Sequence, residues 1–267
     1  KDYKEDFDTQ IATLIEYNSS YPLKKETNDF LSMLKPIISA RYSPNNSKDT
    51  RNTDRRMNVN NIYSLNRLGL NDSVEGGGSL SFGTEFYKTD YSTNREVFTA
   101  KIANVLKFKE DKNIAINSSL GKKTSDIMGY LNFNPSDFFN INYEFSQDEN
   151  LKKTNYQLLK NEFKINNFVT TFEYLNQNNG TSNESYLSNK TVYNFRKSNS
   201  FIFERRENKE TNVTEFYNLM YQYRDDCLIA AIKYNKDYYT DRDLKPDESI
   251  YLNLTIIPFG ETKSPNL

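Results

Sequence analysis

Apolar and polar residues alternate along several stretches of the chain, and this period of two restricts the fold more than any other feature. From Phe139 to Ser146, the odd-numbered residues are apolar or aromatic and the even-numbered ones are polar. The pattern recurs between Leu159 and Ile165 and from Ile250 to Ile256. Successive side chains of a β-strand point to opposite faces of the sheet, so each stretch predicts a strand with one apolar and one polar face.

Short polar breaks separate these stretches, as at Asn134-Pro135-Ser136-Asp137, and predict an antiparallel meander. We expect about thirteen strands, centred near residues 12, 36, 81, 102, 129, 142, 159, 171, 190, 203, 218, 232 and 253. Many span roughly 9–12 residues, the length of a tilted membrane-crossing strand. Short breaks alternate with longer ones, as in outer-membrane barrels. Residues 43–73 predict a long loop and residues 261–267 a polar tail.

The composition suits a sheet that buries one face and wets the other. Hydrophobic residues make up 36% of the chain, yet it contains 20 Tyr and 18 Phe, too many for a disordered protein. No apolar run approaches the ~18–20 residues of a membrane-spanning helix. The strand pattern alone leaves three folds open: a transmembrane β-barrel, a soluble β-sandwich and a β-rich repeat protein. Because Trp is absent, an aromatic girdle would consist of Tyr and Phe.

Charge and residue usage exclude several functions. The net charge is −1, which gives no sign of a nucleic-acid partner. The chain has no His and one Cys, which removes His-based catalytic triads and most metal sites. Asp225 and Asp226 are adjacent carboxylates without a nucleophile and base around them. We therefore expect no enzyme activity, no catalytic residues, no cofactor and no metal site.

Three stretches carry a resemblance to a known family. They are Leu34–Asn45, Asn61–Gly83 and Tyr223–Cys227, the last followed by an alternating strand, a loop and a final strand that ends at Phe259-Gly260. In order and spacing they resemble the C-terminal region of the LptD (OstA) family of lipopolysaccharide-assembly outer-membrane proteins. The resemblance runs from about Leu14 to Gly260.

The resemblance implies that residues 1–267 are the C-terminal part of one larger, antiparallel transmembrane β-barrel domain, with a periplasmic domain preceding Lys1. It further implies a translocon component that inserts lipopolysaccharide into the outer leaflet of the Gram-negative outer membrane through a barrel lumen and a lateral gate. Implied partners are lipopolysaccharide, outer-membrane lipids, a plug lipoprotein of the LptE type and periplasmic Lpt bridge proteins that bind the N-terminal domain. The alternatives are a general porin or receptor barrel and a soluble β-sandwich binding module.

The resemblance also implies roles for single residues. Cys227 would form a disulfide with the N-terminal domain, although this chain has only Cys227 where better-known members have two adjacent cysteines. The alternative for Cys227 is a small strand residue without a partner. The strand Ser249–Phe259 would form one side of the lateral gate, with Ile250, Leu252, Leu254 and Ile256 facing lipid. Pro258 has no N–H to donate and would weaken the seam, or would simply end the strand.

Arginines of the predicted loop are candidates for contacts with lipopolysaccharide phosphates. These residues are Arg51, Arg55, Arg56 and Arg67. The competing interpretation, which we favour, is a solvated loop in which the arginines pair with Asp49, Asp54 and Asp72. Gly76-Gly77-Gly78 opens a strand and lacks a following Lys-Ser/Thr, so it predicts a bend or bulge instead of a phosphate-binding loop.

Overall fold

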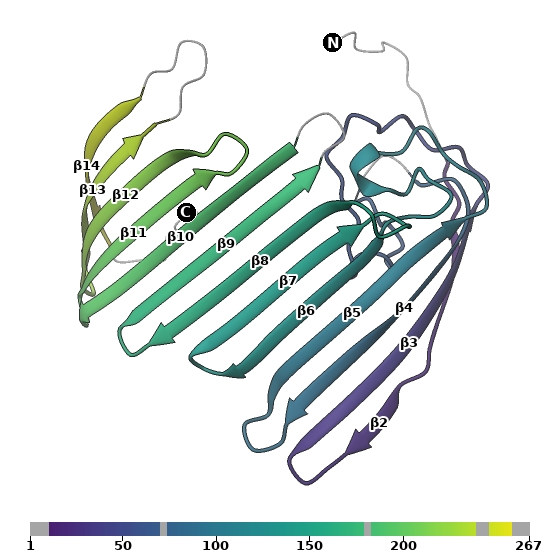
Figure 1. The fold of residues 1–267 in the computed structure, drawn as a ribbon, viewed down its shortest axis with the longest axis horizontal. Coiled ribbons are helices and arrows are strands. Elements are labelled where there is room, and N and C mark those ends of the chain that lie inside the picture. The colour runs from purple at the N-terminus through teal and green to yellow at the C-terminus, as the bar shows by residue number, and fades with distance from the viewer. Residues whose placement is uncertain (1–10, 70–73, 179–182, 239–245, 258–267) are drawn as a thin grey trace. The chain divides into compact units, whose positions relative to one another are not determined.

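The computed structural model describes residues 11–69, 74–178, 183–238 and 246–257, and their regular secondary structure is β-strand apart from one 3-10 helix, η1 (Ile116–Ser118) (Figure 1). Among these residues, no helix has the length and apolar character needed to cross a membrane. The strands are β1 (Ile15–Ser20), β2 (Leu23–Glu26), β3 (Phe30–Ser43), β4 (Gly77–Asp90), β5 (Arg95–Lys107), β6 (Ile127–Ser136), β7 (Phe139–Gln147), β8 (Thr154–Ile165), β9 (Phe168–Asn178), β10 (Asn183–Arg196), β11 (Asn199–Asn208), β12 (Val213–Arg224), β13 (Leu228–Asp237) and β14 (Asp247–Ile256).

These strands form one 14-stranded sheet in which each strand from β3 to β14 lies beside the next along the chain. β1 and β2 both pair with β3, and the pairings whose registers are known are antiparallel. The predicted all-β antiparallel class is therefore confirmed. The expected thirteen strands were one too few, because β2 has four residues and is too short for an alternation to be visible.

The connections between strands alternate in length. Short ones join β4 to β5 (91–94), β6 to β7 (137–138), β8 to β9 (166–167), β10 to β11 (197–198) and β12 to β13 (225–227). Long ones join β3 to β4 (44–76), β5 to β6 (108–126) and β7 to β8 (148–153). Because consecutive connections of an antiparallel meander leave opposite ends of the strands, the sheet has a short-turn end and a long-loop end. The predicted alternation of turns and loops is confirmed.

Asparagine provides the backbone conformation that several turns require. Asn94, Asn166 and Asn212 have φ values of 50°, 50° and 54°. Asn tolerates this left-handed region better than most residues with a side chain. The polar breaks in the sequence therefore end strands through local backbone preference as well as through solvation.

The chain divides into two compact units. In the unit formed by residues 133–143, 157–177 and 183–267, the strand register separates two faces. Phe203 lies opposite Leu219, Leu219 opposite Tyr234, and Tyr234 opposite Ile250. Residues directly opposite each other on antiparallel strands share a face. The next row of opposed residues on the same face is Phe201, Tyr221, Ile232 and Leu252. We call this face the apolar face of the unit.

The other face of this unit carries charge and amides and is called its polar face. Lys190 pairs with Glu204 at 2.8 Å, and the Asn218 side-chain amide donates to Glu204 at 3.3 Å. One strand pair further on, Lys160 Nζ lies 2.7 Å from Glu173, and the Tyr186 hydroxyl donates to the same carboxylate. Alternation along each strand therefore becomes a separation between a hydrocarbon surface and a hydrogen-bonding surface.

β7 shows the alternation expected from its sequence. The Phe139 ring lies 4.9 Å from the Phe163 ring and 6.4 Å from the Phe133 ring, measured between centroids. The Asn142 amide donates to Asn140, on the opposite side of the strand. The period of two is confirmed here, whereas contact of Phe139, Ile141, Tyr143 and Phe145 with lipid stays a prediction.

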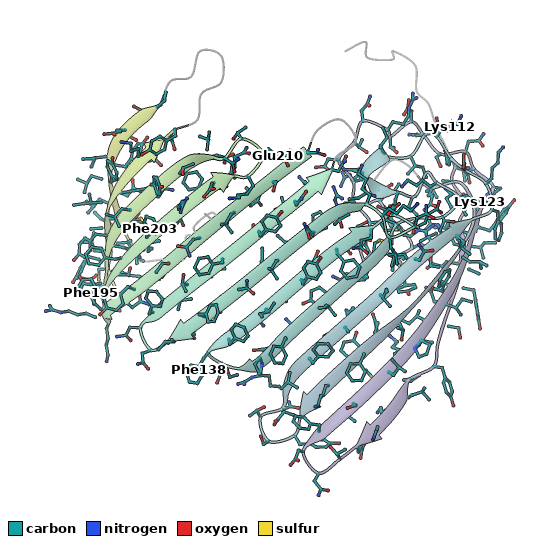
Figure 2. The ribbon with its side chains drawn as sticks, in the orientation of Figure 1. Lys112, Lys123, Phe138, Phe195, Phe203 and Glu210 are labelled. Atoms are coloured by element: carbon teal, nitrogen blue, oxygen red, sulfur yellow. The ribbon has the colours of Figure 1, made fainter. Side chains whose placement is uncertain are left out.

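Aromatic rings collect near the short-turn end of β10 to β12 (Figure 2). Phe195 stacks on Phe201 at 5.3 Å between centroids, and Tyr221 lies 5.4 Å from Phe201. Tyr193 stacks on Phe195. Outer-membrane barrels place aromatic girdles where the hydrocarbon meets water. Tyr and Phe make up this cluster, as the absence of Trp requires.

We predict that a charge on the apolar face costs much more than the same charge on the polar face. Leu219→Lys should lower the free energy of unfolding from lipid bilayers by about 2–4 kcal/mol, because a cation near the middle of the hydrocarbon loses its hydration. The matched control is Met220→Lys, on the neighbouring residue that faces Lys233, and should cost less than half as much. Equal costs in denaturant titrations would show that the two faces do not differ in environment.

Candidate functional site: the charged cluster and the two sheet faces

The described residues of the long connection 44–76, which are 44–69 and 74–76, pack on one face of their unit, which contains residues 1–132, 144–156 and 178–182. The connection's apolar side chains Met57, Val59, Ile62 and Leu68 share a hydrophobic core with β5, β6 and the connection 108–126. The partners are Ala103, Val105, Ile114, Leu120 and Met128. The face that receives the connection is called the covered face. The favoured interpretation of a solvated loop was wrong for this part of the segment.

Backbone and side-chain hydrogen bonds join the connection 44–76 to the connection 108–126. The Thr50 N–H donates to the carbonyl of Asn113 at 2.7 Å. The Ser47 hydroxyl donates to Asp111 Oδ2 at 2.5 Å and accepts the Gly76 N–H at 2.8 Å. A Cβ on Gly76 would lie 2.1 Å from the carbonyl oxygen of Asn45, so only glycine fits at this approach. Gly77 follows with φ +81° at the start of β4, which fits the predicted bend.

Glu75 is the centre of a buried charged cluster on the covered face. Its carboxylate forms a two-pronged ion pair with Arg67, whose Nη2 and Nε lie 2.8 and 3.1 Å from the two oxygens. The side chains of Arg67 and Glu75 are only 1% and 4% exposed. Arg67 also donates to the hydroxyls of Ser79 and Ser81 on β4. Its guanidinium therefore joins the connection to the sheet.

Two more cations from neighbouring strands reach the same carboxylate. Arg41 Nε of β3 lies 3.9 Å from Glu75, and its Nη1 donates to the carbonyls of Ser64 and Leu65. Lys107 Nζ of β5 lies 3.3 Å from Glu75 and 3.9 Å from Asp111. Glu75 is therefore the shared ion-pair partner of three buried cations, and Asp111 lies at the edge of this cluster. A buried charge that loses its partner is strongly destabilising, so this cluster fixes the connection in place.

Tyr63 of the connection is enclosed against β4 and β5. Its hydroxyl is buried without a hydrogen bond among the described residues, and a Cβ on Gly83 would collide with it. Burial, aided by the negative charge of Glu85, raises the pKa of Tyr63 to about 12. The covered face therefore excludes water from part of its surface.

The four arginines proposed for phosphate contacts do not gather in one site. Arg51 pairs with Asp49 at 2.6 Å on the surface, as the favoured interpretation of a solvated loop predicted. The arginine holds the pKa of Asp49 at about 2. The Arg56 guanidinium stacks over the Tyr156 ring at 4.6 Å, and Arg55 is exposed. Arg67 is bound inside the protein by Glu75, which speaks against a phosphate contact. Asp72 lies outside the described residues.

Cys227 lies at the short-turn end, directly before β13, and is exposed. Asp225 Oδ1 accepts the N–H groups of Cys227 and Leu228, both at 2.9 Å, and these bonds lower the pKa of Asp225. The turn thus presents the Cys227 residue at the surface. The disulfide to an N-terminal domain stays a prediction.

β14 is the last strand of the sheet order and pairs with β13. Ile250 and Leu252 are each 74% exposed, and Leu254 and Ile256 are 63% and 67% exposed. Leu252 lies opposite Ile232 of β13, and Leu254 lies opposite Ala230, so β14 extends the apolar face. Pro258 and the polar tail lie outside the described residues, so the seam role of Pro258 stays a prediction.

A family model described as LptD, LPS transport system D, matches residues 3–208. The chain belongs to the LptD family. Members of this family are outer-membrane β-barrel proteins of lipopolysaccharide transport, which confirms the predicted family and fold class. It also makes lipopolysaccharide the substrate at the level of the family. No curated protein matches the chain.

Membership in the LptD family explains why exposed Ile, Leu and Phe side chains line one face of a sheet that also carries many charges. The hydrocarbon of the membrane covers such a face in an outer-membrane barrel. The buried cluster around Glu75 was not found from the sequence, although apolar residues at 57, 59, 62, 63 and 68 in a polar segment were a usable signal. That the chain is not an enzyme stays a prediction.

We predict that Glu75→Gln loosens the connection 44–76. The amide keeps the shape of the carboxylate but removes its charge, so Arg41, Arg67 and Lys107 lose their shared partner, at a cost of roughly 3–5 kcal/mol. Hydrogen exchange of residues 44–69 should then quicken by orders of magnitude relative to the β10–β13 strands. Asp49→Asn, which breaks an exposed pair, is the control and should leave exchange nearly unchanged. Unchanged exchange in Glu75→Gln would contradict the role of the cluster.

Proposed function

We propose that this chain forms part of the wall of an outer-membrane translocon that inserts lipopolysaccharide into the outer leaflet. The polar face lines the lumen through which the sugars pass, and the apolar face contacts the membrane. The observation that carries the proposal is the separation of faces in a chain of the LptD family: Lys160, Glu173, Lys190 and Glu204 lie on the polar face. Leu219, Ile232 and Leu252 lie on the apolar face.

The orientation follows from the connections. Short turns of outer-membrane barrels face the periplasm and longer loops face the exterior. In this orientation Cys227 lies on the periplasmic side, where oxidising conditions preserve disulfides. Its position supports pairing with a cysteine of a periplasmic N-terminal domain. A plug lipoprotein of the LptE type and the Lpt bridge proteins are the remaining partners of this proposal.

β14 forms one side of the lateral gate in this proposal. Every hydrogen bond across a seam must be given up when lipid passes, at about 1 kcal/mol net each and more where freed groups face hydrocarbon. β14 pairs with β13 along its whole length, whereas its other edge is an end of the sheet order of the described residues. That edge is the place where the ladder can open without breaking the sheet.

A disulfide across the seam tests this function. One cysteine replaces Leu254, and the second is placed opposite it in the strand that closes the barrel against β14, in the full-length protein. We expect lipopolysaccharide at the cell surface to fall to background when the disulfide forms and to recover on reduction, with barrel assembly unchanged. The matched control joins Ala230→Cys to Leu254→Cys, which lie opposite each other within β13 and β14. Wild-type delivery with a fully formed seam disulfide would rule out the gate.

A further inference from the structure

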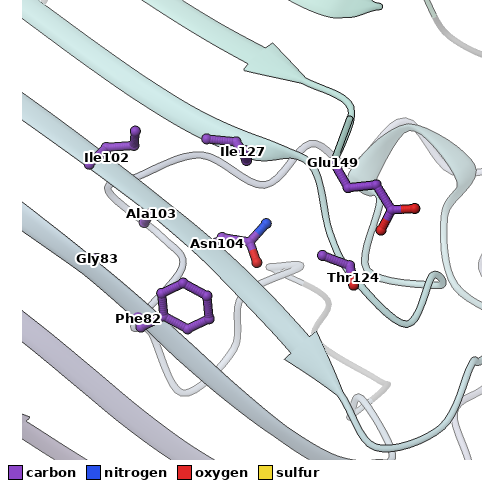
Figure 3. A pocket seen from close by; sticks show the side chains of 8 residues that line it. All are labelled: Phe82, Gly83, Ile102, Ala103, Asn104, Thr124, Ile127 and Glu149. Atoms are coloured by element: carbon purple, nitrogen blue, oxygen red, sulfur yellow. The ribbon is translucent and has the colours of Figure 1, made fainter. Parts of the chain in front are cut away.

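A pocket of about 310 Å³ lies between β4, β5 and the start of β6 (Figure 3). Its volume is at the lower end of the ~300–1,000 Å³ typical of small-molecule sites, enough for one extended chain but not for a whole lipid. Apolar residues line one part of the pocket: Phe82, Gly83, Ile102, Ala103 and Ile127. Three polar side chains lie toward the other part: Asn104, Thr124 and Glu149.

The pocket opens on the sheet face opposite the covered face. Phe82 lies directly opposite Ile38, and both are exposed, at 44% and 51%. Ile102 is 45% exposed, whereas its neighbour Ala103 is buried in the core with the connection 44–76. Met128 belongs to that core as well, so alternation places Ile127 on the opposite face. Phe82, Ile102 and Ile127 therefore belong to the surface that faces lipid in an outer-membrane barrel.

The pocket exists because the approach to β6 departs from a regular ladder. The Asn104 amide donates to the carbonyls of Ser125 and Asp126 at 2.8 and 3.2 Å. The Val105 N–H donates to the hydroxyl of Ser125 at 2.9 Å, where a regular ladder has a carbonyl acceptor. Leu106 and Thr124 form only an isolated bridge. These side-chain bonds satisfy the backbone and leave a recess on the apolar surface.

We propose that this recess binds one acyl chain of lipopolysaccharide in the outer leaflet, outside the transport path. The recess is apolar and continuous with the membrane-facing surface, so its occupant is a hydrocarbon chain. Phe82 lies in the first half of β4 and Asn104 in the second half of β5, so both lie toward the long-loop end of their strands. The orientation in this step rests on the proposed function, which places that end in the outer leaflet, where the inserted lipid is lipopolysaccharide.

The polar residues of the pocket lie at the end where the polar linkage of a bound acyl chain would be. Thr124 and Glu149 belong to the connections 108–126 and 148–153, which leave the strands at the long-loop end. An acyl chain that enters from this end has its polar linkage beside these residues and its methyl end toward Phe82 and Ile102. The site would hold one lipid beside the barrel after its delivery.

Site-specific photo-crosslinking in cells tests the site in the full-length protein. Benzoylphenylalanine replaces Phe82, whose phenyl ring it retains, or Ile38, which lies on the same face outside the pocket. We expect a lipopolysaccharide adduct at position 82 several-fold stronger than at position 38. Ile127→Trp, which fills the recess, should reduce the adduct at position 82 to the level at position 38 and leave the latter unchanged.

The outcomes separate the site from the transport function. Equal adducts at the two positions, or an adduct at position 82 that Ile127→Trp does not lower, would overturn the site. A phospholipid adduct in place of lipopolysaccharide at position 82 would overturn the assignment of the ligand. Surface lipopolysaccharide, measured in the same strains, should stay at the wild-type level with Ile127→Trp. Loss of delivery by the seam disulfide is an independent result, so either proposal can fail alone.

Discussion

A sheet that crosses a membrane must bond its own backbone along its whole length, because hydrocarbon offers no water to a free N–H or C=O group. β4 with 14 residues meets this constraint by pairing with β3 from end to end, and β12 with 12 residues meets it through its pairings with β11 and β13 together. The backbone bonds fix the register, and the register fixes which side chains share a face. The separation of Leu219 from Asn218 is thus a consequence of the ladder.

The ladder does not account for the covered face, where the connection 44–76 packs. There the hydrophobic core around Val105 and the ion cluster around Glu75 act together. The core removes water, and the loss of water makes the pairing of Arg67 with Glu75 obligatory, since an unpaired buried charge is costly. The core and the ion cluster together therefore hold the connection against this face of the sheet.

The sequence predicted the parts of the fold that depend on local pattern. The period of two located the strands from β3 to β14. Consecutive residues of a strand face opposite sides of the sheet, so the two environments appear as alternating apolar and polar residues in the sequence. It did not locate the core of the connection, since Met57 and Ile62 are isolated apolar residues whose partner Val105 is far away in the chain. The same holds for Glu75, which meets Arg41 and Lys107 only after β3, β4 and β5 have paired. The family motif around Asn61–Gly83 marked this region without revealing its contacts.

The most direct test of the two-faced sheet is the reactivity of single cysteines along β11 in intact cells, with a water-soluble thiol reagent. Ile202 and Glu204 lie on the polar face, and Phe201 and Phe203 lie on the apolar face. Ile202 is informative because its own side chain is apolar, so only its position predicts contact with water. We expect Ile202→Cys and Glu204→Cys to react and Phe201→Cys and Phe203→Cys to be protected. Reactivity without this period of two, or with the opposite phase, would contradict the account.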